Sequence, residues 1–122
     1  MTSPLVELLR SLKKTLESET SIPVFFTWQD EQTFEPFIVL GEGNTDDSLS
    51  PKAGKAVTNL ALQAHLFYPG ESRIKVEDER NRVTGVLYKA SNRIVNVASE
   101  VMKDDSVGRE VYHVVITLSA LI

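Results

Sequence analysis

The chain has 122 residues, which suits one domain able to bury about two thirds of the surface that its unfolded form exposes. It contains no cysteine, which excludes disulfides, a thiol nucleophile and a cysteine-based zinc site. The mixed charges sum to −4, which argues against a dedicated nucleic-acid binder, and no segment approaches the roughly 20 apolar residues of a membrane span. We therefore expect a protein partner.

The chain opens with residues 3–18, SPLVELLRSLKKTLES, which have the pattern of an amphipathic helix. Ser3 can cap its N-terminus, and Pro4 occupies the favoured first helical position. One face carries the leucines at helical spacing, namely Leu5, Leu8, Leu9, Leu12 and Leu16. We expect this face to cover the domain's own sheet.

Two short strands are predicted next, in residues 22–28 and 36–41, because both are rich in β-branched and aromatic residues. Pro36 suits the first position of the second strand, where no ladder donor is needed. Strands so close in sequence favour a hairpin.

Residues 42–54 contain Gly, Asn, Asp, Ser and Pro without apolar periodicity, so they predict a long, mobile loop. Loops of this length in compact domains are commonly functional or disordered, and a solvated hairpin tip is an equally good interpretation. Its charges and the lysine that follows are the candidate interaction residues: Asp46, Asp47, Lys52 and Lys55.

The longest predicted strand spans residues 55–68, and its alternation places apolar side chains on nearly all of one face. Pro69 and Gly70 end it with a turn. A second helix is predicted between Ser72 and Ser91, in which Gly85 indicates a close approach to the sheet.

Residues 94–102 and 110–122 alternate again and predict a second hairpin. The whole chain, residues 1–122, therefore reads as one α+β domain with the order α-β-β-β-α-β-β. In this arrangement two helices pack on one face of a mostly antiparallel sheet.

The two histidines, His65 and His113, lie inside predicted strands, where a histidine usually fills a half-polar sheet surface. They could form a metal pair if the strands are neighbours, but these strands supply no carboxylate of the right parity to complete a ligand set. The acidic pairs Asp46-Asp47 and Asp104-Asp105 lie in predicted turns, where Asp is favoured for backbone reasons. We expect no catalytic residue, no metal site, no cofactor and no enzyme activity.

Several segments in sequence order, IPVFFTW, PFIVLGEG, the Asn-Thr-Asp-Asp loop, TNLALQAHLFYPG and a helix ending in VLYKA, resemble the tail-completion and tail-terminator proteins of long-tailed bacteriophages and prophages. The resemblance covers nearly the whole chain. It implies a structural protein of the virion tail's neck region, assembled in the host cytoplasm, that forms a ring, often a hexamer. Its other implied partners are the tail-tube protein, whose growth it stops, and the head connector or head-completion protein. No cofactor, reaction, membrane or specific nucleic acid belongs to that role.

In such a ring the loop charges named above would point toward the lumen or a neighbouring part. We also expect Arg80 and Arg82 to pair with a neighbour's acids and to set the ring geometry. The alternative is a small acidic cytosolic α/β binding module, such as a secretion-type chaperone, which would form a dimer and capture an unfolded segment on an apolar patch.

Overall fold

The computed structural model describes residues 3–30, 32–46, 59–70, 72–105 and 109–122. Within these ranges the predicted order of two helices and five strands is confirmed. The elements are α1 (Pro4–Thr20), β1 (Val24–Phe25), β2 (Phe37–Asp46), β3 (Asn59–Pro69), α2 (Arg73–Ala90), β4 (Ile94–Asp104) and β5 (Val111–Leu121).

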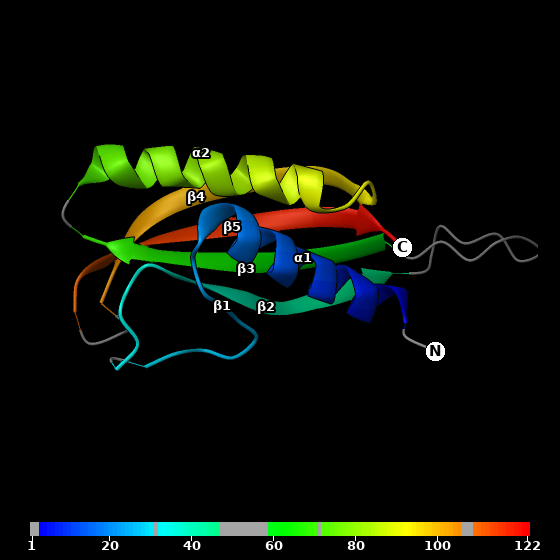
Figure 1. Cartoon of the computed structure of the whole chain (residues 1–122), viewed down its shortest axis with the longest axis horizontal. Coiled ribbons are helices and arrows are strands. Elements are labelled where there is room, and N and C mark those ends of the chain that lie inside the picture. The colour runs from blue at the N-terminus through cyan, green and yellow to red at the C-terminus, as the bar shows by residue number, and fades with distance from the viewer. Residues whose placement is uncertain (1–2, 31, 47–58, 71, 106–108) are drawn as a thin grey trace, which may run out of the picture.

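The described strands form one sheet in the order β1-β2-β3-β5-β4, in which every pairing except that of β1 with β2 is antiparallel. Both helices lie on the same face of this sheet (Figure 1). The main core fills the space between these two layers and combines the leucines of α1 with apolar residues of α2 and the strands. The fold is therefore a two-layer α+β sandwich, as predicted.

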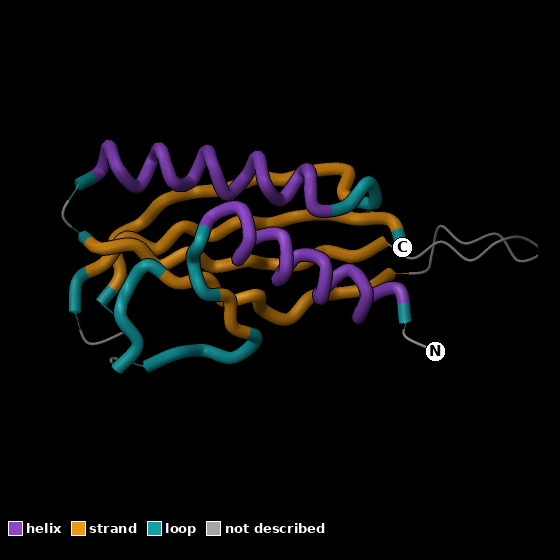
Figure 2. Tube along the Cα trace, in the orientation of Figure 1, coloured by secondary structure: helices purple, strands orange, loops and turns teal. Residues whose placement is uncertain are grey.

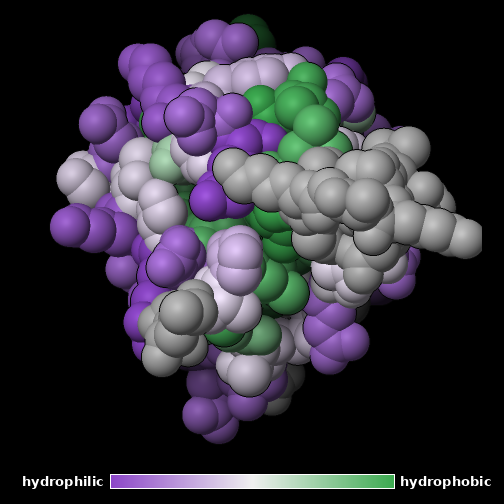
Figure 3. All heavy atoms as spheres, turned by 90° about the vertical axis from the view of Figure 1, so that its right-hand side faces the viewer, coloured by the Kyte–Doolittle hydropathy of each residue, from purple (hydrophilic) through white to green (hydrophobic). Residues whose placement is uncertain are grey.

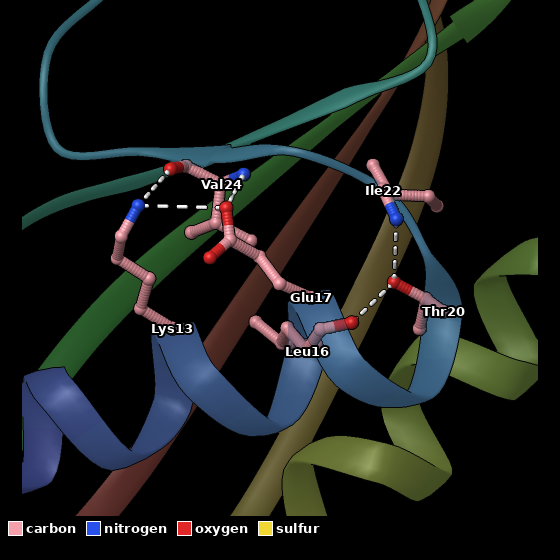
Figure 4. A network of polar contacts seen from close by, with 6 residues as sticks. All are labelled: Lys13, Leu16, Glu17, Thr20, Ile22 and Val24. Atoms are coloured by element: carbon pink, nitrogen blue, oxygen red, sulfur yellow. Dashed lines mark hydrogen bonds and ion pairs between the residues drawn. The ribbon is translucent and has the colours of Figure 1, made fainter.

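The predicted hairpin between the first two strands is wrong, because β1 runs parallel to β2, with Val24 opposite Ile38. Side chains of α1 explain this pairing (Figure 4): Glu17 accepts a hydrogen bond from the Val24 N–H at 3.1 Å, and the Lys13 ammonium donates to the Val24 carbonyl at 2.9 Å. The chain is thus tied to α1 where it enters the sheet, and it needs a crossover, not a tight turn, to reach β2.

That crossover consists of residues 26–30 and 32–36, here called the covering loop, which Figure 2 shows in teal at the margin of the sheet. The predicted strand 22–28 therefore shrinks to two residues. The covering loop carries three exposed aromatic side chains, those of Phe26, Trp28 and Phe34.

The second strand is longer than predicted, because β2 continues to Asp46 and so includes the start of the predicted loop 42–54. After an irregularity between Leu40 and Gly43, the register resumes with Gly43 opposite Leu62. This part of β2 can have a polar sequence because its residues 42–45 are exposed. It lies beyond Ile38 and Val39, the residues of β2 that pair with β1. The rest of that loop, and residues 55–58 of the predicted central strand, lie outside the described residues.

Two glycines differ in the space around them. A Cβ at Gly43 would lie 2.5 Å from the carbonyl oxygen of Ala61, so the close approach of β2 to β3 requires a residue without a side chain. A Cβ at Gly85 would meet nothing within 4 Å, so the predicted approach of this helical glycine to the sheet is wrong.

We therefore expect opposite effects from two alanine substitutions. Gly43→Ala should lower the free energy of unfolding by about 1–3 kcal/mol through overpacking. Gly85→Ala, its matched control, should raise it by about 0.5–1 kcal/mol, because alanine loses less backbone entropy in a helix. Urea denaturation measures both values, and equal effects of the two substitutions would contradict the described β2–β3 contact.

Candidate functional site

Three polar side chains form a continuous hydrogen-bonded chain across the sheet, on the face opposite the helices. His65 of β3 and His113 of β5 lie with Nδ1 and Nε2, respectively, 2.8 Å apart. The other ring nitrogen of His113, Nδ1, is 2.9 Å from the Oδ2 of Asp104 in β4. The strand order β3-β5-β4 brings these residues together from three neighbouring strands.

The carboxylate at one end fixes the direction of the hydrogen bonds. Because the Asp104 carboxylate only accepts, His113 donates from Nδ1. In a neutral His113 the other nitrogen, Nε2, is then the acceptor of the Nδ1 proton of a neutral His65. This order leaves the Nε2 of His65 as an acceptor that faces Gly41, where an added Cβ would lie 3.4 Å away.

Aromatic rings enclose the imidazoles. Trp28 lies over His65 with ring centroids 4.6 Å apart, and Phe67 stacks on His113 at 4.4 Å. Phe67 also stacks on Phe37. Phe37 and Phe67, together with Val39, Val111 and the partly buried Phe25, form a second, smaller core on the helix-free face. The histidines are therefore only 7% and 9% exposed, although the Trp28 ring itself is 61% exposed.

An ion pair ties the covering loop to Arg109, which lies two residues before β5. The Arg109 guanidinium donates to both carboxylate oxygens of Glu35, at 2.9 and 2.6 Å, and to the carbonyl of Thr33 at 2.7 Å. The Glu35 side chain is only 6% exposed, and the guanidinium also lies 5.0 Å from the Phe34 ring centroid. Two parallel charge-assisted hydrogen bonds of this kind fix both distance and orientation.

The environment of His65 lowers its pKa from the usual 6.5 to about 4. Burial is the larger cause, because it disfavours the charged ring, and the electrostatic interaction with His113 lowers the pKa further. His65 is therefore neutral at physiological pH.

The prediction that the histidines fill a half-polar sheet surface is wrong, since both are buried and bonded to each other. Asp104 was missed as their partner because its neighbours Asp105 and Ser106 suggested a turn, whereas β4 continues to Asp104. Both ring nitrogens of His113 are occupied, which leaves a metal ion only one nitrogen of the pair. Among the described residues, no group of three His, Asp or Glu side chains could hold a metal ion.

The predicted interaction residues of the loop fall largely outside the described chain. Asp46 is the last residue of β2, and Asp47, Lys52 and Lys55 lie outside the described residues.

The two candidate inter-subunit arginines have partners within the chain. Arg80 donates to the hydroxyl of Ser99 at 2.8 Å and to its carbonyl at 2.7 Å, so it ties α2 to β4. Arg82 contacts Glu79 and donates to the carbonyl of Thr20 at the end of α1, at 3.3 Å.

A second candidate site is an apolar pocket of about 490 Å³ between the start of α1 and the outer part of β2. Figure 3 views this end of the molecule and shows apolar atoms, in green, at its centre. Side chains of Leu5, Leu9, Phe26, Leu40, Leu60 and Leu62 line the pocket together with Gly41, Glu42 and Gly43. The helical spacing predicts that the leucines of α1 cover the sheet, but it does not predict that two of them, Leu5 and Leu9, line an open pocket.

No model of a known protein family matches the chain, and no curated protein matches its sequence. Neither described helix is long and apolar enough to cross a membrane.

The His65 pKa predicts how stability depends on pH. Unfolded His65 binds a proton below about pH 6.5, whereas folded His65 does so only near pH 4, so protons favour the unfolded chain between these values. The contribution is complete above pH 6.5, and on the order of 3 kcal/mol should be lost as the pH falls to 4. Denaturant titrations at several pH values, followed by fluorescence of the chain's one tryptophan, Trp28, measure this loss.

The control for this experiment is His65→Gln, which keeps a donor for His113 but does not titrate. Its unfolding free energy should vary less between pH 6.5 and 4 than that of the natural protein. The same pH dependence in both proteins would refute the assignment.

Arg109→Lys should loosen the covering loop, because an ammonium cannot reproduce the forked contact with Glu35. We expect a loss of about 1–3 kcal/mol of unfolding free energy and faster amide exchange in residues 32–36. Exchange measured by mass spectrometry should be unchanged in β5 beyond Tyr112, and loosening of the whole sheet would contradict a local role.

Proposed function

We propose that the protein is a tail terminator, a structural assembly protein that caps the tail tube of a long-tailed phage or prophage and forms the interface to the head connector. The sequence resemblance suggests this role, and the surface supports it by offering a docking site for protein. The proposal includes a ring of identical copies, which in the proteins that the chain resembles is often a hexamer.

The observation that carries the proposal is the apolar pocket beside an unpaired strand edge. β1 pairs only with Ile38 and Val39, so the outer side of β2 from Gly41 to Asp46 has no strand partner among the described residues. An open strand edge offers main-chain donors and acceptors, and the adjoining pocket offers apolar surface. Protein partners commonly use both features together.

The polar chain of Asp104, His113 and His65 is better explained by structure than by catalysis. Its terminal nitrogen faces Gly41 under the Trp28 ring, and the pocket described above is lined by none of these three residues. A general base needs room for a substrate within hydrogen-bond reach. We therefore propose that the protein acts by binding and not as an enzyme.

Light scattering after size-exclusion chromatography, combined with negative-stain electron microscopy, tests the proposal. We expect rings of several copies, and we expect these rings to bind the ends of polymerised tail tubes and to stop their growth. A protein that stays monomeric with and without tail-tube protein would refute the proposal. A stable dimer that captures an unfolded polypeptide would instead favour the secretion-type chaperone.

A further inference from the structure

The margin of the sheet opposite the pocket presents exposed apolar side chains. Tyr88 near the end of α2 is 47% exposed, and Val95 near the start of β4 is 56% exposed. We call these two residues the apolar knob. Lys89 and Arg93, which adjoin them in sequence, are exposed as well.

Two outward backbone groups of β4 near the knob already have side-chain partners. The Tyr88 hydroxyl accepts a hydrogen bond from the Val97 N–H at 3.0 Å, and Arg80 occupies the carbonyl of Ser99. A further strand cannot pair with β4 at these positions. The β4 edge of the sheet therefore offers protruding side chains for a contact, whereas the β2 edge offers the apolar pocket.

The strand register places the knob and the pocket at the same level of the sheet. Leu62 lines the pocket and lies opposite Leu118 of β5, which in turn lies opposite Val97 of β4. The pocket and Tyr88 both lie on the helix side, since α1 borders the pocket and α2 carries Tyr88, and Val95 lies in the irregular start of the edge strand β4. Figure 1 shows the start of α1 and the end of α2 at the same end of the molecule.

Charges around the two features are complementary. Glu42 is exposed at the rim of the pocket, and the knob is flanked by the cations Lys89 and Arg93. A second copy of the chain, set beside the first in the same orientation, would bring these opposite charges together. Charge pairs of this kind fix the register of an interface and exclude wrong partners.

We propose that the apolar knob of one copy seats in the pocket of the next copy, with Glu42 facing Lys89 and Arg93 across the contact. This inference rests on the proposed function and names the surfaces that would join the ring. The contact uses two different surfaces, so it is heterologous and leads to a closed ring or an open chain of copies, never to a two-fold dimer.

Two substitutions of exposed residues test the apolar part of the contact. Val95→Asp should lower the association constant between copies at least tenfold, because a carboxylate would enter an apolar pocket. Ile74→Asp is the matched control, since Ile74 is 76% exposed near the other end of α2 and should leave association unchanged. Light scattering gives the association constants, and thermal unfolding verifies that both variants fold.

Charge exchange tests the polar part. Glu42→Lys alone and the double variant Lys89→Glu with Arg93→Glu should each fail to assemble. A mixture of the two should form oligomers in which the two variants alternate, because each contact between unlike copies pairs opposite charges, whereas each contact between like copies pairs like charges.

Cross-linking distinguishes the geometry of the contact. The natural chain has no cysteine, so Glu42→Cys together with Arg93→Cys adds the chain's only two thiols. A short bismaleimide should then yield covalent oligomers up to the full ring, whereas each single variant should yield none. Cross-linked dimers of a single variant would reveal a two-fold contact and overturn the inference.

The results separate the two proposals. If the natural protein forms rings that Val95→Asp and the charge variants leave intact, the named surfaces are wrong and the proposed function stands. If the natural protein forms no oligomer with or without tail-tube protein, the proposed function and the inference both fail.

Discussion

The structure depends on the middle of β3, because residues Ala64 to Phe67 are buried on both faces of the sheet. On one face Leu60, Leu62 and Leu66 pack under the helices, as the alternation predicts. On the other face His65 and Phe67 have no helix above them, and the covering loop takes its place. The forked contact of Arg109 with Glu35 holds that loop, so an ion pair at the loop's far end stabilises packing in the middle of the sheet.

The buried polar chain follows from the same constraint. Two imidazoles beneath aromatic rings lose their contact with water, and a buried polar group without a partner would be destabilising. Asp104 meets this requirement for His113, and His113 meets it for His65. Among the described residues, every buried side-chain nitrogen and oxygen has a hydrogen-bond partner. Such a network favours one register of β3, β5 and β4, because a shift of one residue would turn the imidazoles to the other face.

Local signals in the sequence were sufficient for most of the fold. The helix at Pro4–Thr20 followed from its leucine spacing and from Ser3, whose hydroxyl accepts the Val6 N–H at its N-terminus. The order of elements and the antiparallel core of the sheet also followed from periodicity and turn residues. Sequence patterns failed where a strand's partner depends on side chains far along the chain. The direction of β1 depends on Lys13 and Glu17, which no pattern within residues 22–28 reveals.

The candidate site was harder to predict for the same reason. Both histidines were identified, but their partner Asp104 lies on a third strand whose length was underestimated. Turn residues after Asp104 gave the stronger local signal. The apolar pocket could not be predicted either, because it arises where α1, β2 and β3 diverge, and periodicity shows only which residues are apolar. The family resemblance does not help here, because it rests on sequence segments and does not give the positions of α1, β2 and β3 relative to one another.

A contact as small as two side chains in a pocket binds weakly when it is made once, since ordering the two molecules opposes it. A closed ring changes this balance, because each copy then makes two contacts and the last one closes without loss of further translational freedom. Open fragments of the ring, which lack the closing contact, would therefore be scarce beside the closed ring. The modest size of the knob and pocket is therefore compatible with a ring of several copies, as the proposed function requires.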